Sequence, residues 1–404
     1  MNLSFFIARR YLISRKTNNA INIISWISVF AVAVGTAALV IILSFMNGLT
    51  GLVKDLYNSF DADIEVTRVY GKTFQPDSLM IKKLHDINGI QFIDFSVEDN
   101  ALLKYGDKQT FAVVKGVGDD FFKMTKLESQ IEDGNSVLKA RDGYYVVMGK
   151  GLNYQLGIYI HNKFSSLQLF SPKKGNAAVF TPEDGLIEEQ VIPGGYFTIN
   201  DEFDYKYVIV HREVAQRLFD CDNEVSSIEI ALASDASPQD TKDAIQAVMG
   251  KDFQVKDRYE QNKTLFSTLQ SEKLVVFIVL VFVLLVATFN IIGSLIMLMM
   301  EKKKDMRTLL NLGADEKFIQ KIFHLEGMLI VLAGALAGLI LGLGFCFLHM
   351  KFELITMQAL GREMAYPMKM FISDFLLIFS VVILIGWIAA WFPVRIFIRK
   401  FHFS

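Results

Sequence analysis

Residues 301–327 read EKKKDMRTLLNLGADEKFIQKIFHLEG and separate two long apolar runs. Apolar residues recur in this segment at roughly helical spacing, which predicts a short amphipathic helix: Met306, Leu309, Leu310 and Leu312. Gly313 can adopt the left-handed conformation that ends this helix. Asp315 is placed to cap a second helix, which continues into the next apolar run. The many lysines, together with Arg307, predict that the segment stays on the cytoplasmic side of a membrane.

A short helix that is joined directly to a membrane span on each side can transmit force from a soluble partner. The same composition also suits an ordinary basic loop that only sets the orientation of the chain. The residues of this segment leave both interpretations open.

The composition of the whole chain indicates a membrane protein. Of its 404 residues, 52% are hydrophobic, which is high for a soluble protein of this size. Four apolar runs are long enough to cross a bilayer: residues 21–46, 274–300, 322–348 and 371–394. The net charge of −2 gives no indication of a nucleic-acid partner. The two cysteines lie far apart in different settings, so we expect neither a disulfide nor a metal site.

The order of these runs predicts the domain organisation. The sequence predicts an α-helical membrane protein with four transmembrane helices and a large α+β extracytoplasmic domain, residues 47–272, inserted between the first and the second. Within it, residues 130–200 are richer in Gly and short strands and suggest an inserted β-rich part, flanked by α+β parts at 47–129 and 201–272. The remaining segments are an interfacial helix at 1–20, a cytoplasmic coupling region at 301–321, an outer loop at 349–370 and a cytoplasmic tail at 395–404.

Details of the apolar runs refine this picture. Ala31-Val32-Ala33 resembles a signal-peptide cleavage site, but the apolar run continues well beyond it, so we expect an uncleaved anchor. Gly334, Gly338 and Gly342 are spaced by four and predict close helix packing. Glu326 and His324 lie near the cytoplasmic end of their run, where we expect them to reach water.

The sequence contains no convincing catalytic constellation. Gly143…Gly149-Lys150 is similar to a phosphate-binding loop, but its spacing is one residue too long and Gly151 stands where Ser or Thr would hold magnesium. His211-Arg212-Glu213 lacks the second histidine of a zinc-protease helix. No span carries the series of acidic and basic residues expected of an ion-coupled transporter. We therefore expect a non-catalytic protein that binds no cofactor.

Several stretches resemble a known family of membrane proteins. FFIARRYLISRK (5–16), the run LSFMNG (43–48) and the segment 146–172 closely resemble the lipoprotein-releasing permeases LolC and LolE. The segment 301–314 is similar to the coupling region of the wider permease group that includes MacB and FtsX. Arg307 and Thr308 depart from the small or aliphatic residues that are usual there, so the partner contact is expected to be more polar in this chain. The resemblance covers nearly the whole chain.

The resemblance implies a function that the residues alone do not. Such permeases pair, with the same or a related chain, and bind a dimer of a LolD-like ATPase, which uses ATP and Mg. The complex lifts a lipoprotein substrate out of the membrane lipids and passes it to a LolA-like periplasmic carrier. The location implied is the bacterial inner membrane, with several spans, both termini in the cytoplasm and the large domain in the periplasm.

Three groups of residues are predicted to carry this function. The ATPase-coupling residues are Lys304, Asp305, Met306, Leu309, Leu310, Leu312 and Gly313. The walls of a lipid cavity are Leu39, Leu43, Met46, Ile278 and Phe282. A carrier-binding loop within 170–190 is represented by Phe170, Pro172, Lys173, Phe180 and Pro182. Each apolar cavity residue equally suits ordinary lipid-facing or helix-packing surface.

Two other functions remain open at this point. A MacB-like efflux permease would move a peptide or small amphiphile, but MacB-like chains carry a fused ATPase that this sequence lacks. An FtsX-like signal transmitter would relay ATP-driven motion to a cell-wall enzyme, but such proteins have a smaller outer domain.

Overall fold

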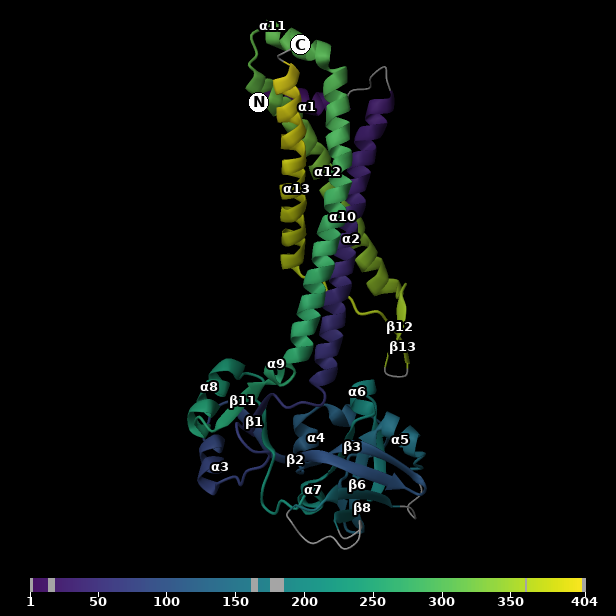
Figure 1. Cartoon of the computed structure of the whole chain (residues 1–404), viewed down its shortest axis with the longest axis vertical. Coiled ribbons are helices and arrows are strands. Elements are labelled where there is room, and N and C mark those ends of the chain that lie inside the picture. The colour runs from purple at the N-terminus through teal and green to yellow at the C-terminus, as the bar shows by residue number, and fades with distance from the viewer. Residues whose placement is uncertain (1–2, 14–18, 161–165, 175–184, 360–361, 402–404) are drawn as a thin grey trace. The chain divides into compact units, whose positions relative to one another are not determined.

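The computed structural model describes residues 3–13, 19–160, 166–174, 185–359 and 362–401. The chain forms two compact units (Figure 1). The helical unit comprises Met1–Leu52, Ser267–Met357 and Met364–Ser404, and the β domain comprises Val53–Phe266 with Gln358–Glu363.

Long helices dominate the helical unit. It contains α1 (Leu3–Ile13), most of α2 (Asn19–Tyr57) and of α10 (Lys263–Glu301), α11 (Lys303–Asn311), α12 (Glu316–Phe352) and α13 (Ile372–Phe401). The hairpin of β12 (Thr356–Ala359) and β13 (Arg362–Ala365) follows α12. In the described chain, four helices are long and apolar enough to cross a membrane, namely α2, α10, α12 and α13. The predicted number of spans is confirmed.

Close packing of α12 on α2 depends on the predicted glycine stripe. A Cβ atom on Gly334 would lie 2.7 Å from Val32 Cβ, and one on Gly338 would lie 2.5 Å from the carbonyl oxygen of Ala33. A Cβ atom on Gly342 would lie 2.8 Å from Val40 Cβ. Small residues therefore let the two backbones approach, as packing between membrane helices requires.

The segment between α10 and α12 has the predicted local structure. Helix α11 ends before Gly313, whose φ of +93° is the left-handed conformation that suits glycine. The Asp315 side chain caps α12 by accepting a hydrogen bond of 2.9 Å from the Phe318 N–H. One expectation here is wrong, because Glu326 is fully buried within the helical unit and does not reach water.

The helices are longer than the apolar runs predicted. Helix α2 continues to Tyr57 instead of ending near Met46, and α10 begins at Lys263 instead of near Leu274. A helix satisfies its own backbone hydrogen bonds, so it can continue into polar sequence when its far end finds packing. The far ends of both helices pack in the core of the β domain, through Val53 and Leu56 of α2 and Leu265 of α10.

The strands of the β domain form one connected sheet. They are β1 (Ile64–Arg68), β2 (Ile90–Tyr105), β3 (Lys108–Val117), β4 (Ile131–Gly134), β5 (Lys139–Ala140), β6 (Gly143–Gly149), β7 (Leu167–Pro172), β8 (Leu186–Phe197), β9 (Tyr207–His211), β10 (Ser227–Leu232) and β11 (Phe253–Asp257). Their order is β11-β1-β10-β2-β3-β9-β6-β8-β4, with β5 beside β6 and β7 between β2 and β8.

The β-rich part predicted at 130–200 is not a separate module. Strand β2 pairs with β10 through its first half and with β3 and β7 through its second. Because β7 also pairs with β8, strands β2, β3, β9, β6, β8 and β7 close into a ring. Closure leaves no free edges in this ring. Its strands come from both sides of the predicted boundary, so the division predicted from composition is wrong.

Short helices cover the two faces of the sheet. One core contains residues of α3 (Ser78–His85), α5 (Lys150–Leu156), α7 (Arg212–Leu218) and α8 (Pro238–Met249) together with Val146, Met148 and Val210. The other contains residues of α4 (Phe121–Met124), the 3₁₀ helix Leu127–Gln130 and α6 (Asp201–Asp204) together with Val147 and Ile209. Successive residues of β6 and β9 thus point to opposite cores, as a pleated strand requires. Helix α9 (Arg258–Gln261) leads from β11 to α10.

Candidate functional site

A pocket with an apolar wall lies at one end of the helical unit. Its volume is about 720 Å³. Leu43 of α2, Leu274 and Phe277 of α10 and Leu377 of α13 supply its apolar surface, and Ser267, Gln270, Ser271, Lys273 and Asp374 supply polar groups. Three membrane-spanning helices thus contribute to one pocket that has an apolar wall and polar groups. Such a site suits an amphiphile. We refer to it as the helix-end pocket.

Three polar side chains join the same three helices beside the helix-end pocket. Lys273 Nζ of α10 donates a hydrogen bond of 2.7 Å to Asn47 Oδ1 of α2. Asn47 Nδ2 in turn donates to Asp374 Oδ2 of α13 at 2.5 Å, and Lys273 Nζ lies 3.6 Å from the same carboxylate oxygen. We call Asn47, Lys273 and Asp374 the clasp. Its bonds must break if α10 and α13 separate from α2.

Sequence reasoning missed the clasp. Asn47 falls within the LSFMNG run, and Asp374 is an isolated acid at the start of an apolar run. Each residue could therefore have been singled out from the sequence as a candidate functional residue. Their pairing could not be seen, because 226 and 327 positions separate Asn47 from its two partners. The neighbouring Gly48 allows a close approach as well, since a Cβ there would lie 1.9 Å from the carbonyl oxygen of Pro367.

The structure separates the predicted cavity residues. Leu39 and Leu43 are buried among the helices, and Met46 is half-buried. Ile278 and Phe282 are 57% and 64% exposed on α10, so they do not face Leu39 within this unit. Leu43 alone of the predicted five lines the helix-end pocket, where Phe277 takes the place predicted for its neighbour Ile278. A helix turns by about 100° per residue, so adjacent side chains point in different directions.

The predicted coupling residues also divide into two groups. Met306 is 2% exposed and belongs to the core of the helical unit, and Leu310 packs against that core. Met306 holds α11 in place and its side chain is not available to a partner, which corrects the prediction for Met306. Leu312 is 78% exposed, and Lys304 and Asp305 lie on the surface, with Lys302 Nζ 3.1 Å from Asp305 Oδ2. Leu309 is half-buried.

The predicted carrier-binding loop is shorter than 170–190. Phe170 and Pro172 belong to β7, with Phe170 opposite Glu188 and Pro172 opposite Leu186 of β8. Lys173 continues this pairing, because its N–H donates to the carbonyl oxygen of Gly185 at 2.9 Å. Phe180 and Pro182 lie outside the described residues. Strands β7 and β8 pair as an antiparallel hairpin, and residues 175–184 between them lie outside the described residues.

An exposed apolar row lies at the base of this hairpin. Leu102 of β2 is opposite both Phe111 of β3 and Phe170 of β7, so the three side chains lie on the same outer face of the ring. Phe111 is 76% exposed, and the other two are half-buried. Such a row beside a surface hairpin is suited to docking another protein.

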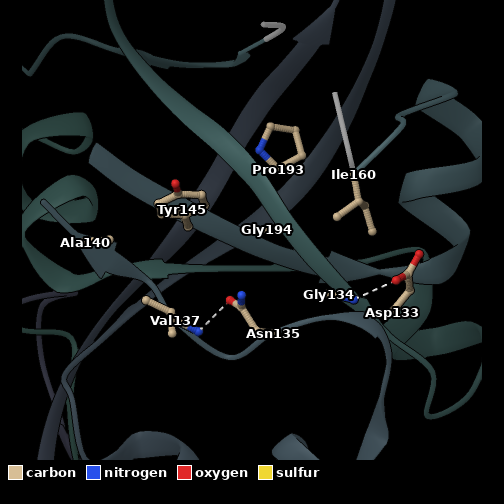
Figure 2. Close-up of a pocket in the computed structure, with 9 residues that line it drawn as sticks. All are labelled: Asp133, Gly134, Asn135, Val137, Ala140, Tyr145, Ile160, Pro193 and Gly194. Atoms are coloured by element: carbon tan, nitrogen blue, oxygen red, sulfur yellow. Dashed lines mark hydrogen bonds between the residues drawn. The ribbon is translucent and has the colours of Figure 1, made fainter. Parts of the chain in front are cut away.

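A second pocket, of about 500 Å³, lies beside β4 and β8 of the β domain (Figure 2). Its described lining contains one carboxylate, Asp133, whose Oδ1 accepts from the Gly134 N–H at 2.9 Å. Figure 2 shows Tyr145 and Pro193 on the strands and Asn135 on the adjoining segment, where Asn135 Oδ1 accepts from the Val137 N–H. The hydroxyl of the lining residue Tyr145 donates a hydrogen bond of 2.6 Å to Asp142 Oδ2.

The loop that is similar to a phosphate-binding motif is filled by protein. A Cβ on Gly149 would lie 2.2 Å from the carbonyl oxygen of Asp204, so α6 packs directly on this glycine. The Lys150 ammonium is paired with Glu132 at 2.7 Å.

Two protein families match parts of this chain. The FtsX-like permease C-terminal family matches residues 277–401. The MacB-like periplasmic core domain family matches residues 25–162. The first match begins within α10 and continues through α13, and the second covers most of α2 and the first strands of the β domain.

Individual relatives match over most of the chain. The lipoprotein-releasing system transmembrane protein LolC of Neisseria meningitidis serogroup B is 25% identical over 351 residues, which cover 84% of this chain and 81% of the relative. The LolE protein of Haemophilus influenzae is 24% identical over 355 residues, covering 85% and 82%. Among solved structures, the periplasmic region of MacB from Actinobacillus actinomycetemcomitans matches with a TM-score of 0.36 at 11% identity, covering 53% of this chain and 97% of that one. The predicted resemblance is confirmed by the two relatives and the two family matches.

Proposed function

We propose that this chain, which belongs to the LolC/LolE family within the wider group of FtsX-like and MacB-like permeases, is the permease subunit of an ABC transporter that releases lipoproteins from the inner membrane. The observation that carries the proposal is the similarity to lipoprotein-releasing proteins across 84% of the chain. The helix-end pocket supports it, because it combines an apolar wall from three spans with polar groups.

The physics of the cargo explains why such a pocket is needed. Each methylene of an acyl chain contributes about 0.8 kcal/mol to membrane binding, so exposing one chain to water costs on the order of 10 kcal/mol. A lipoprotein with several chains cannot leave through solvent at a useful rate. In our proposal the chains move from the bilayer along the apolar wall formed by Leu43, Leu274 and Phe277 and are handed to an apolar acceptor.

The proposed orientation follows from the charges beside the spans. Lys302, Lys303, Lys304 and Arg307 lie between α10 and α12, and short basic segments remain in the cytoplasm. In our proposal both termini and α11 therefore lie inside. The β domain and the clasp end of the helices then lie on the periplasmic side, where a released lipoprotein must emerge.

The energy source in this proposal is a separate, LolD-like ATPase dimer that uses ATP and Mg. It would bind α11 through the exposed Leu312 and Lys304, while Met306 and Leu310 anchor α11 to the spans. A second permease subunit, the same or a related chain, completes the transporter. The chain itself performs no chemistry in this scheme.

The proposed acceptor is a LolA-like carrier that docks on the β domain. The row of Phe111, Leu102 and Phe170 offers an apolar surface beside the β7–β8 hairpin. Binding there would keep the carrier next to strands β7 and β8.

The test is reconstitution of the full chain with its ATPase in liposomes that contain a triacylated lipoprotein. We expect ATP-dependent transfer to a LolA-like carrier, and we expect Leu312→Asp to abolish transfer while the protein stays in the membrane. Lys321→Asp, a charge change on the exposed side of α12, is the control and should leave transfer unchanged. Transfer at the normal rate by the Leu312→Asp protein would contradict the proposed coupling surface.

The FtsX-like match to α10–α13 favours one second candidate, a protein that only relays ATP-driven motion. The reconstitution separates the two, because a relay would hydrolyse ATP without moving lipoprotein. A pull-down with the full chain adds a second criterion: recovery of a cell-wall hydrolase supports the relay, and recovery of a lipoprotein carrier supports transport.

A further inference from the structure

A group of charged side chains lies inside the β domain around Lys115. The group consists of Asp61, which follows α2, together with Glu65 of β1, Glu98 of β2, Lys115 of β3 and Glu229 of β10. These residues border a cavity of about 150 Å³. We call them the buried charge cluster. The transport scheme proposed above does not use them.

Lys115 is the centre of this cluster. Its ammonium lies 2.6 Å from Glu229 Oε1 and 3.9 Å from Glu98 Oε2, and the Lys115 and Glu229 side chains are only 8% and 3% exposed. The same ammonium lies 5.2 Å from the ring centroid of Phe60 and 5.4 Å from that of Phe121. A desolvated cation between two rings and two carboxylates is held strongly in one place.

The cluster contains more negative charge than Lys115 can balance. Glu65 lies directly opposite Glu229 in the register of β1 and β10, an arrangement that repels. Lys256 of β11 lies opposite Glu65, and Arg258 of α9 acts on Asp61. Asp94 of β2, which Arg212 of α7 approaches to 3.7 Å, adds a further carboxylate opposite Glu229.

Some carboxylates of this negatively charged cluster bind protons more readily than they would in water. Burial raises the pKa of Asp61 to about 6 and that of Glu65 to about 7, although Lys115 opposes both shifts. Burial likewise raises the pKa of Asp94 to about 6 and raises the pKa of Tyr207. For Lys115, burial lowers the pKa, but Glu229 and Glu98 outweigh it and the pKa rises. Asp61, Glu65 and Asp94 therefore exchange protons at pH values of about 6 to 7, while Lys115 stays charged.

The cluster lies where both long helices enter the β domain. Asn262, just before α10, donates from Nδ2 to Asp61 Oδ2 at 2.5 Å, and Gln261 Nε2 donates to the carbonyl oxygen of Ala62 at 3.3 Å. The last turn of α2 and Leu265 of α10 pack in the same core as Phe60. The two connecting segments, 58–63 and 258–262, are thus tied to each other and, through Phe60 and Asp61, adjoin Lys115.

We propose that Lys115 is a positioning residue that holds the connecting segments 58–63 and 258–262 to the sheet as one joint, and that protonation of the surrounding carboxylates tightens this joint. The proposal rests on the proposed function, because the joint would pass motion of the two helices to the β domain during lipoprotein release. Protonation tightens the joint chiefly because it removes the desolvation cost of the charged Asp61 and Glu65 carboxylates, and it also lessens their repulsion by Glu229.

Hydrogen exchange of the full chain in lipid nanodiscs tests the joint directly. We expect amides of 58–63 and 258–262 to exchange at least about tenfold faster in Lys115→Met than in the wild type, because the joint opens locally. After correction for intrinsic exchange, wild-type protection of these segments should increase from pH 8 to pH 5.5. Asp61→Asn, which is nearly isosteric, should remove the part of this pH dependence near pH 6.

Controls separate a joint from a merely structural residue. Lys139→Met removes an exposed lysine that is paired with Glu213 in the same domain and should change neither segment. Lys115→Met/Glu229→Leu replaces the ion pair by apolar groups, which can restore packing. We expect the double variant to regain protection and to keep a pH dependence, because Asp61 and Glu65 remain.

Reconstituted transport supplies the functional readout. We expect Lys115→Met to lower the lipoprotein released per ATP at least about fivefold, a typical coupling factor, with ATP hydrolysis unchanged. Wild-type protection and wild-type release per ATP in Lys115→Met would overturn the inference, and so would an unchanged pH profile in Asp61→Asn. Absence of release by the wild type would refute the proposed function instead, while the exchange profile would still decide whether the joint exists.

Discussion

Each of the two units contains a network centred on one lysine, and the two networks differ in burial. In the helical unit, Lys273 lies 3.6 Å from Asp374, and the side chains are 34% and 18% exposed. In the β domain, Lys115 lies 2.6 Å from Glu229, and the side chains are 8% and 3% exposed. The first network joins three helices near a pocket, and the second joins strands to two connecting segments.

Burial decides what each network can do. Water and counterions compete for a partly exposed pair, so it adds little to stability and can open and close at small cost. A buried pair that loses one partner leaves an uncompensated charge in a medium of low polarity, which is strongly unfavourable. The clasp is therefore suited to a gate, and the buried charge cluster to a joint that stays closed.

The largest expected effect follows from breaking the buried network. Lys115→Met leaves Glu229 without its cation and should destabilise the β domain by about 3–5 kcal/mol. Hydrogen exchange of amides in β3 and β10, measured on the full chain, gives this free energy directly.

Lys139→Met is the matched comparison, because Lys139 and Glu213 are 47% and 45% exposed and 2.9 Å apart. The Lys139→Met substitution should lower the free energy of unfolding of the β domain by no more than about 1 kcal/mol. Equal losses in the two variants would show that burial does not distinguish these networks.

The next prediction tests whether the clasp acts as a gate or only as a stabilising ion pair. Lys273→Asp places two carboxylates side by side and should lower lipoprotein release about tenfold by favouring an open gate, with a change in stability of about 1 kcal/mol. Lys273→Asp/Asp374→Lys restores opposite charges and should recover most of the release. Release that stays low in the double variant, with normal protein levels, would argue against a gate and for a direct role of Lys273 in binding.

The sequence predicts structural features well when the residues that form them are close together in the chain, and poorly when those residues are far apart. Gly313, Asp315 and the glycine stripe of α12 act through the backbone of one or two helices, so spacing alone predicts them. The closed ring of strands depends on β2 being shared between two sets of partners, which alternation within a strand cannot reveal.

Both lysine networks form between residues that are far apart in the sequence. Lys115 appears in the sequence as one lysine within a strand, and nothing near it predicts Glu229, which is 114 positions away by the residue numbers. Likewise, the apolar runs predict four spans but not which side chains meet, so Phe277 replaces Ile278 in the pocket. Long-range pairing and helix rotation are set by tertiary packing, which a single sequence does not display.

A third effect concerns pH and acts on one unit alone. The folded-state pKa values of Asp61 and Glu65, about 6 and about 7, exceed the ordinary values of 3.8 and 4.5 for these groups. The folded β domain then binds more protons than the unfolded chain between about pH 4 and pH 7, so its stability should fall as the pH rises through this window. Exchange protection of β1 and β10 from pH 5 to pH 8 measures this slope.

Asp61→Asn should flatten the part of the slope near pH 6, and the helical unit should show no matching change. A slope of the opposite sign in the wild type would mean that the salt bridges of the domain, and not the buried carboxylates, dominate its titration.

The smallest expected effect comes from the neutral member of the clasp. Asn47→Ala removes one hydrogen bond to Lys273 and one to Asp374 but keeps both charges, which can then approach each other more closely than 3.6 Å. Each lost hydrogen bond contributes about 1 kcal/mol, and the closer ion pair offsets part of it. We expect a loss of about 1 kcal/mol in the free energy of opening, measured from exchange at the start of α13, and no change in the β domain. Asn47→Ala could instead reduce lipoprotein release as strongly as Lys273→Asp does. The Asn47 amide, and not the charge pair, would then hold the three helices together. The gate in the helical unit would in that case be a set of neutral hydrogen bonds, and the comparison with the buried charge cluster would have to be made with Asn47 and not with Lys273.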